Sequence, residues 1–158
     1  MKILNLKKSG FTLIEVLVVI GIIAVLAAVV LVAVNPARQF KLARDSQRTS
    51  NVQAILSAVG QNISEHKGLF TCTDSNISIP IVSTLIADKN KTSTTTIDIA
   101  PCVVPDYISS LPYDPSGTST SYVTDDNYNT GYYISQDENG RITVSANGEL
   151  TKDISVTR

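Results

Sequence analysis

Side chains suited to catalysis and metal binding are scarce in this chain of 158 residues. It has a single histidine, His66, so a metal site built on two imidazole ligands is excluded. No nucleophile stands in an evident pair with a general base, which argues against a hydrolase. We therefore expect no enzymatic activity and no bound cofactor, and we expect His66 to be a helix-terminal cation or a solvated residue.

Positive charge is not in excess either, with 13 Lys and Arg against 14 Asp and Glu. The charges are unevenly placed, because residues 35–50 carry a net +3 while the chain from residue 69 onward has five basic and eleven acidic side chains. An acidic C-terminal part without interleaved basic and aromatic residues does not support nucleic-acid binding. The asymmetry suits contacts between the basic segment of one subunit and the acidic part of another, or simply solvated faces.

The chain does have one long apolar run near its N-terminus. The run extends over the 24 residues from Phe11 to Val34, which as a helix measure about 36 Å, enough to span a ~30 Å hydrocarbon core with some tilt. Gly21 and four alanines within it offer small surfaces for close helix packing. A single carboxylate, Glu15, interrupts the run and would cost about 2.5–3.5 kcal/mol at mid-membrane on insertion scales. An ionisable residue inside such a segment indicates a functional role.

Two ordinary kinds of N-terminal segment share some of these features. A secretory signal peptide would begin with a basic stretch such as Lys2, Lys7 and Lys8, and residues 25–27 offer a small-residue cleavage site. Cleavage there would leave seven further apolar residues on the product, which disfavours this alternative. A plain signal anchor would explain the hydrophobicity but not the order Gly-Phe-Thr-Leu-x-Glu at residues 10–15.

Residues 7–15, Lys-Lys-Ser-Gly-Phe-Thr-Leu-Ile-Glu, resemble the class III signal of type IV pilins and of the related pseudopilins of type II secretion. The resemblance is close over residues 7–34 and looser along the following helix. It implies a precursor that a prepilin peptidase cuts after Gly10, so that residues 1–10 form a leader peptide. Phe11 then becomes the N-terminal residue and is N-methylated.

The resemblance also implies how the mature chain assembles. Cleavage creates an α-amine at Phe11, and Glu15 of a neighbouring copy neutralises it in a dry filament core, where a lone charge costs far more than a pair. This contact sets the axial register between copies, and the Thr12 hydroxyl supports it by bonding backbone or amine. The implied partners are copies of the chain itself, the prepilin peptidase and methyltransferase, an assembly platform and, before assembly, the lipid bilayer.

Three functions are compatible with these features. The first is a structural subunit of an extracellular type IV pilus, and the second is a pseudopilin of a short periplasmic fibre that drives secretion. The third is a membrane-anchored binding domain that does not polymerise. Basic residues flank the span on both sides, so charge gives no clear orientation, and the cytoplasmic N-terminus in the inner membrane is implied by the resemblance.

Residues 35–68 are expected to form an amphipathic stalk helix. Asn35 could cap a new helix with Pro36 in its first turn, or Pro36 could kink one long curved helix, as the resemblance implies. The helix should end near residues 65–68, with Gly68 directly after its C-cap. Polar side chains recur along its first half at Arg38, Lys41, Asp45 and Arg48. Apolar side chains recur at helical spacing along its second half at Val52, Ile55, Leu56, Val59 and Ile63.

The C-terminal residues 131–158 carry the clearest β pattern. Two Asn-Gly pairs separate alternating segments and predict an antiparallel meander. Glu138 and Arg141 should face each other across the first of these turns. The expected fold class is α+β, with a long N-terminal helix packed on the C-terminal meander, as in the pilin fold. The predicted strand segments are residues 131–135, 142–144, 149–151 and 154–156.

Residues 69–130 have few regular patterns and are expected to form a variable loop region, with a hydroxyl-rich loop at residues 92–96. A head outside the cytoplasm would lie in an oxidising environment, which favours a disulfide between Cys72 and Cys102 over two free thiols. Closing about 30 residues should stabilise the fold by roughly 3–4 kcal/mol in the chain-entropy picture. Many pilins carry a disulfide that pins the C-terminal region, whereas this pair would tie the middle segment.

An acidic turn precedes the predicted meander. The run Leu-Pro-Tyr-Asp-Pro at residues 111–115 resembles the segment before the sheet in major pseudopilins, some of which bind calcium in this region. Asp125 and Asp126, with Asp114 and backbone carbonyls, could supply hard oxygen ligands. The spacing fits no recognised calcium loop, so a solvated acidic turn is favoured.

Overall fold

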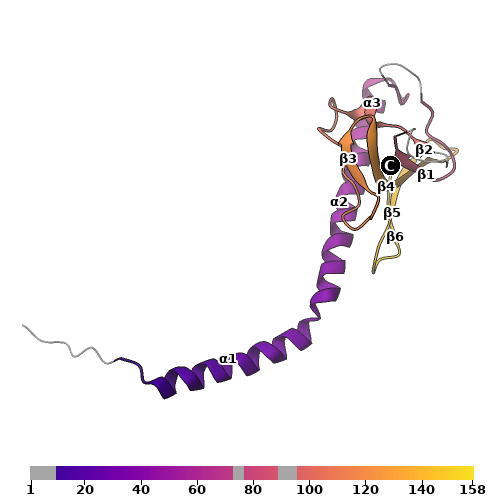
Figure 1. The fold of residues 1–158 in the computed structure, drawn as a ribbon. Helices are drawn as coiled ribbons and strands as arrows, with labels where there is room; N and C mark the ends of the chain where they lie inside the picture. Colours follow the sequence, from indigo (N-terminus) through magenta and orange to yellow (C-terminus); the bar gives the residue numbers. More distant parts are fainter. Residues whose placement is uncertain (1–9, 73–76, 89–95) are drawn as a thin grey trace, which may run out of the picture. The chain divides into compact units, whose positions relative to one another are not determined.

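The computed structural model describes residues 10–72, 77–88 and 96–158. They fall into two compact units, Met1–Gln39 and Phe40–Arg158. Figure 1 shows their helices and strands. Of the predicted leader, only Gly10 belongs to the described residues. Residues 92–95 of the expected hydroxyl-rich loop also lie outside them.

The first unit consists mainly of helix α1, Leu13–Val34, whose 22 residues correspond to about 33 Å. None of its residues is buried in the chain. Among the described helices, α1 alone is long and apolar enough to cross a membrane, judged by length and composition. A helix that is apolar all round needs an apolar surrounding, either lipid or other helices.

Helix α2, Pro36–Glu65, is separated from α1 at Asn35. Asn35 has φ 48° and ψ 78°, a left-handed conformation that asparagine adopts more readily than most residues. Its Oδ1 accepts a hydrogen bond from the Arg38 N–H at 3.2 Å, so it caps the new helix, and Pro36 takes the first helical position. The capping alternative is thus confirmed, and the single continuous helix implied by the family resemblance is wrong for this chain.

In the second unit, the apolar face of α2 packs against a six-stranded sheet (Figure 1). The helix stripe predicted from sequence is confirmed, because Val52, Ile55, Leu56 and Val59 are buried and Ile63 packs against them. The largest buried side chains opposite include Tyr128, Tyr132, Ile86, Ile134 and Val144. The predicted α+β layout is therefore confirmed.

The C-terminal end of α2 is a Schellman-type stop. The Gly68 N–H donates to the Ile63 carbonyl at 2.9 Å, and Lys67, with φ 57°, is the left-handed residue. The helix ends where predicted, but Gly68 stands one position further beyond the C-cap than expected. His66 is exposed, as predicted.

The sheet has the order β2-β1-β4-β5-β6, and β3 pairs with β4 outside this path. β1 and β2 are parallel, and the other pairs are antiparallel. A short helix, α3 (Ala100–Val103), follows β2. The strands are β1 (Thr84–Ala87), β2 (Thr96–Ile97), β3 (Ser121–Thr124), β4 (Asn127–Gln136), β5 (Ile142–Asn147) and β6 (Asp153–Thr157). Three of the strands, α3 and the start of β4 lie within residues 69–130, so the expected variable loop region contributes a large part of the sheet.

The first predicted hairpin is confirmed, since β4 and β5 pair with Gln136 opposite Ile142. The predicted pair across its turn is wrong, because Arg141 forms its ion pair with Asp137, at 2.7 Å, and not with Glu138. Arg141 pairs with Asp137 because the Asp137 carboxylate also accepts the backbone N–H of Arg141, which holds the two residues together.

In the second predicted hairpin the two strands pair as expected, but the predicted two-residue turn is wrong. β5 ends at Asn147 and β6 begins at Asp153, opposite it, so a five-residue connection replaces the expected two-residue turn. Residues 149–151, predicted as a strand, belong to this connection. The backbone N–H groups of these three residues donate instead to the Asp45 carboxylate on α2.

Candidate functional site

The residues that lead into α1 form a capping box. The Thr12 hydroxyl oxygen accepts the Glu15 N–H at 3.3 Å, while Glu15 Oε2 accepts the Thr12 N–H at 2.7 Å and the Thr12 hydroxyl at 2.8 Å. This reciprocal pair satisfies donors that a helix start leaves without partners. It places the Glu15 carboxylate at the N-terminal end of the helix, close in sequence to Phe11.

Thr12 and Glu15, both predicted as assembly residues, are therefore brought together by the fold of a single chain. The assembly role predicted from sequence does not include this local contact. A signal for it was present, because Thr-x-x-Glu ahead of an apolar run is the recognised pattern of a capping box. The contact fixes the direction of the carboxylate before any partner binds it.

Gly10 and Phe11, the predicted cleavage residues, are exposed in the chain ahead of α1. Apart from its chain neighbours, no described atom would lie within 4 Å of a Cβ atom at Gly10. The fold of the chain therefore does not itself require glycine at this position. A requirement for glycine here would have to come from a partner that binds the segment.

A second group of polar side chains, not predicted from sequence as a site, joins the first half of α2 to residues 114 and 149. We call Arg44, Asp45, Arg48, Asp114 and Glu149 the Arg48 cluster. The buried Arg48 guanidinium binds Asp114 through two bonds, Nε to Oδ2 at 2.7 Å and Nη2 to Oδ1 at 3.0 Å. Its Nη1 donates to Asp45 Oδ1 at 2.7 Å. Arg48 thus ties α2 to the segment between α3 and β3.

Asp45 ties the same part of α2 to the connection between β5 and β6. Its carboxylate accepts three consecutive backbone N–H groups, from Glu149, Leu150 and Thr151, at 2.8, 2.8 and 3.0 Å. These donors are the reason that residues 149–151 leave the ladder. The connection is tight, because a Cβ atom at Gly148 would lie 2.0 Å from the Thr151 carbonyl oxygen.

The carboxylates of the Arg48 cluster are held in their charged form. Burial alone would raise the pKa of Asp45, but the three backbone N–H groups and Arg48 lower this pKa well below its ordinary value. The hydrogen bond from Arg44 lowers the pKa of Glu149 to about 2. At Asp114 burial is likewise outweighed by the bonds from Arg48, and the pKa is lowered. The cluster is therefore fully ionised near neutral pH.

Two of the basic residues that follow the span are used within their own chain. Arg44 binds Glu149 through two bonds, at 2.5 and 2.7 Å, and Arg48 binds Asp114. The uneven charge seen in the sequence therefore holds the acidic part of the second unit to its own helix. Contacts between the basic segment of one subunit and the acidic part of another stay a prediction, and they would have to use the other basic residues of this segment, Arg38 and Lys41.

The three aspartates considered as calcium ligands do not form one site. Asp114 is bonded by Arg48 and by the N–H groups of Ser116 and Gly117, whereas Asp125 accepts the hydroxyl of Tyr122. A guanidinium against Asp114 disfavours a cation at the same carboxylate. Within the described residues, no group of three His, Cys, Asp or Glu is placed to hold a metal ion.

Cys72 and Cys102 form a disulfide, as predicted. Beside it, the buried Asn62 of α2 donates to the carbonyl oxygens of Thr71 and Cys102, at 2.9 and 2.8 Å, and accepts the Thr71 N–H at 3.1 Å. The disulfide and this amide together fix α3 and the segment after α2 to the end of the helix.

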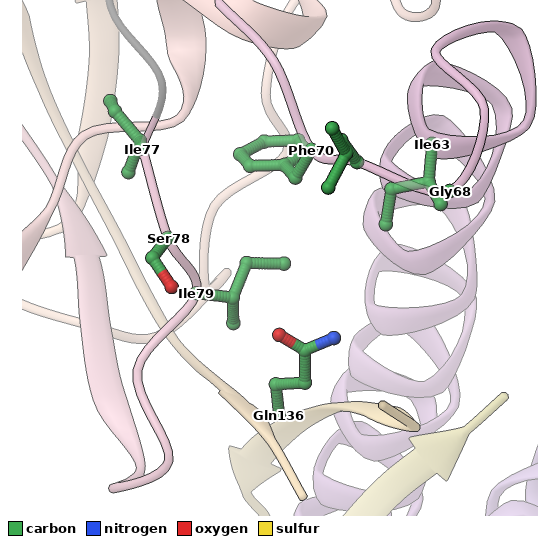
Figure 2. Close-up of a pocket in the computed structure, with 8 residues that line it drawn as sticks. Ile63, Gly68, Phe70, Ile77, Ser78, Ile79 and Gln136 are labelled. Atoms are coloured by element: carbon green, nitrogen blue, oxygen red, sulfur yellow. The ribbon is translucent and has the colours of Figure 1, made fainter. Parts of the chain in front are cut away.

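A cavity of about 260 Å³ lies between the end of α2, residues 77–79 and the end of β4 (Figure 2). Polar and apolar groups contribute about equally to its surface, with the Gln136 amide at one side, and the lining residues are Ile63, Gly68, Leu69, Phe70, Ile77, Ser78, Ile79 and Gln136. None of the described residues that line it can titrate near neutral pH. The described part of the cavity therefore offers no group for acid–base chemistry.

Residues 5–31 match the family model described as the prokaryotic N-terminal methylation motif. This motif is the class III signal peptide of type IV pilins and pseudopilins, so the chain carries the signal of that class of structural proteins. No significant match was found among curated proteins or solved structures. The signal supports a type IV pilin-like or pseudopilin precursor with a membrane-anchoring helix.

Proposed function

We propose that this protein is a structural subunit of a type IV pilus, cut after Gly10 and polymerised through α1. The observation that carries the proposal is α1 itself, a 22-residue apolar helix with no buried residue and a single carboxylate near its start. Such a helix is covered by lipid before assembly and by helices of other copies afterwards. The methylation motif over the same segment supports this assignment.

The proposed assembly step pairs two charges. Removal of the leader gives Phe11 a free amine, and the Glu15 carboxylate of a neighbouring copy binds it within the bundle of α1 helices. Either charge alone would be costly there, and the pair is favourable only in the register that brings both groups together. The Thr12 bonds hold the carboxylate in place during this step, so Thr12 acts as a positioning residue.

A pseudopilin of a type II secretion system is the second candidate, because it would share the same signal and the same helix. Its specific support is the Pro-x-Asp-Pro segment, which the structure places against Arg48. The disulfide and the long segment between α2 and β3 favour a subunit exposed outside the cell. We therefore give preference to the pilus. Long surface filaments that disappear on deletion of the gene would separate the two.

The test of polymerisation is the Glu15→Ala variant, with Glu15→Gln beside it. We expect both variants to be inserted and processed, because neither change affects the cleavage residues, and we expect Glu15→Ala to block filament assembly or slow it severely. Sheared filaments are quantified against processed protein in the membrane. Processed Glu15→Ala protein that builds normal fibres would refute the charge pairing. Normal function of Glu15→Gln in cells where this protein builds no filament would favour the third candidate, an anchored domain that does not polymerise.

A further inference from the structure

We propose that the second unit binds the carboxyl-terminal end of an extended peptide whose last residue is large and apolar. The apolar side chain of this residue would enter the cavity beside the end of α2, and its terminal carboxylate would bind the Arg158 guanidinium. All residues of the site belong to the second unit, so the proposal is independent of α1 and of the pilus assignment.

A second cavity adjoins the cavity described above. It has a volume of about 200 Å³ and lies beside Gly60 of α2, Gly140 of the turn between β4 and β5, and the Arg158 side chain. The two cavities share three residues of their walls, namely Ile63, Gly68 and Gln136. They are therefore neighbouring compartments of one depression. Two such compartments fit a ligand that carries an apolar group and a polar group close together.

Arg158 brings a positive charge without a counter-charge to the second cavity. Its backbone is fixed beside β5, because the Arg158 N–H donates to the Ile142 carbonyl at 3.0 Å and the Ile142 N–H donates to the Arg158 carbonyl at 2.8 Å. No ion pair within the described residues involves the Arg158 side chain. A guanidinium can bind a carboxylate through two parallel hydrogen bonds, so a carboxylate is the group expected here.

Gly60 leaves the second cavity open on the side of α2. It lies inside this helix, where glycine is less favourable than alanine. Among the described atoms, a Cβ atom at Gly60 would meet only the Arg158 side chain, at 3.5 Å, which is an ordinary contact. The packing of the chain therefore does not itself require glycine at this position. The absence of a side chain leaves room for the guanidinium and for a carboxylate bound to it.

The first cavity offers polar groups that match a peptide backbone. Gln136 Nε2 donates to the Gly140 carbonyl at 3.1 Å, which fixes the amide beside the cavity (Figure 2). Within the described residues, nothing donates to Gln136 Oε1, and the backbone of residues 77–79 takes part in no hydrogen bond. Gln136 Oε1 can accept the N–H of the last ligand residue, and residues 77–79 can pair with the residue before it. These groups favour a peptide over a simple acid.

The same cavity offers an apolar surface for the last side chain. Ile63, Phe70, Ile77 and Ile79 face it from the end of α2 and from the segment before β1 (Figure 2). Its volume of about 260 Å³ has room for a phenyl or isobutyl group. Removing such a group from water favours binding in proportion to the apolar area that is covered.

The experiment uses the full-length chain in detergent micelles and a pentapeptide, Gly-Gly-Ser-Ser-Phe, with fluorescein on its N-terminus and a free carboxyl terminus. Fluorescence anisotropy measures binding, with empty micelles as the blank. We expect saturable binding with a Kd of about 0.1 mM. The same peptide with a carboxamide terminus should bind about tenfold more weakly, because it cannot form charge-assisted hydrogen bonds with Arg158. A peptide that ends in Gly should also bind about tenfold more weakly, because the apolar contact is missing.

Two substitutions and a matched control test the site in the protein. Arg158→Gln should weaken binding about tenfold, whereas Arg141→Gln, at an exposed arginine that lines neither cavity, should leave binding unchanged. Gly60→Leu should fill the second cavity and abolish binding. Near-ultraviolet circular dichroism of the tyrosines checks that each variant keeps the folded second unit.

Several results would overturn the proposal. Equal affinity for the acid and the carboxamide, or equal binding by Arg158→Gln and Arg141→Gln, would show that Arg158 does not hold a carboxylate. The lack of any saturable binding at a peptide concentration of about 1 mM would exclude the site, since this is tenfold above the expected Kd. Acetylphenylalanine is measured as a competitor of the peptide. If it binds as tightly as the pentapeptide, the site takes a small free acid, and the assignment to a peptide fails.

Discussion

Glu15 is bonded within its own chain before any partner arrives. Both bonds from Thr12 go to Oε2, at 2.7 and 2.8 Å, and no described residue donates to Oε1. An incoming amine can therefore bind Oε1 while Thr12 keeps the carboxylate oriented. The residue thus caps its helix in the single chain and remains able to pair with Phe11 of a neighbour in the proposed filament.

The cleavage assigned after Gly10 can be tested by a single substitution. The chain has free space for a side chain at Gly10, so we expect Gly10→Val to fold and insert normally but to escape cleavage, because the peptidase site would have to accept a branched Cβ. The measurement is the intact mass of the protein from the membrane. The matched control is Gly21→Val, which also has free space and should be cut like the unmodified chain. Normal cleavage of Gly10→Val would contradict the assigned site.

At the scale of elements, α2 and the connection between β5 and β6 depend on each other through the Arg48 cluster. We expect Arg48→Gln to lower the free energy of unfolding by about 3 kcal/mol, because it leaves the buried Asp45 carboxylate and the half-buried Asp114 carboxylate without their counter-charge. Arg44→Gln, one turn earlier and partly exposed, should have a much smaller effect. All six tyrosines lie at residues 107–133, so near-ultraviolet circular dichroism reports unfolding of the second unit. Equal effects of the two variants would contradict the central role of Arg48.

The same cluster predicts a dependence of stability on pH. The folded-state pKa values of Asp45, Asp114 and Glu149 lie below the ordinary values of 3.8 for Asp and 4.5 for Glu. Groups with lowered pKa values stabilise the fold above those ordinary values, and this contribution is lost as the pH falls through the folded-state pKa values. We expect the free energy of unfolding to change little between about pH 7 and pH 5 and to fall steadily from about pH 4 to pH 2. In Arg48→Gln this acid-dependent loss should be clearly smaller, and an unchanged slope would argue against the assignment.

The elements that could be predicted from sequence are those decided by local patterns. The apolar stripe of α2 and the first hairpin follow from periodicity and from one Asn-Gly turn. The connection after β5 could not be predicted, because Asp45, which binds its N–H groups, is more than a hundred residues away in the chain. The strands between residues 84 and 124 are short, and they become stable only through pairing: β1 and β3 pair with β4, and β2 pairs with β1.

The candidate functional residues also include some that a local sequence pattern predicts and others that only the fold brings together. The signal at Gly10, Phe11 and Glu15 is contiguous and could be identified from sequence alone. The Arg48 cluster combines residues from α2 with residues near 114 and 149, and no local spacing links them. Arg48 appeared in the sequence only as part of a polar stripe, and only the fold shows that it is buried.

At the scale of the whole molecule, the disulfide between Cys72 and Cys102 closes a segment of 30 residues. We expect reduction to lower the free energy of unfolding by about 3–4 kcal/mol through the entropy of the unfolded chain. The double variant Cys72→Ser, Cys102→Ser should show the same loss and should not respond further to a reducing agent. Thermal unfolding, followed through the tyrosine signal, measures both. A fold equally stable with and without the bond would contradict this prediction.

The central claim is that the chain is a precursor cut after Gly10 for assembly through α1. The most direct test is the intact mass and N-terminal residue of the protein purified from native membranes and from sheared surface filaments. The account predicts a chain that begins at Phe11, heavier by one methyl group where the amine is modified, in both fractions. A chain that retains Met1, or one cut near Ala27, would contradict it and would return the protein to the ordinary anchored or secreted class.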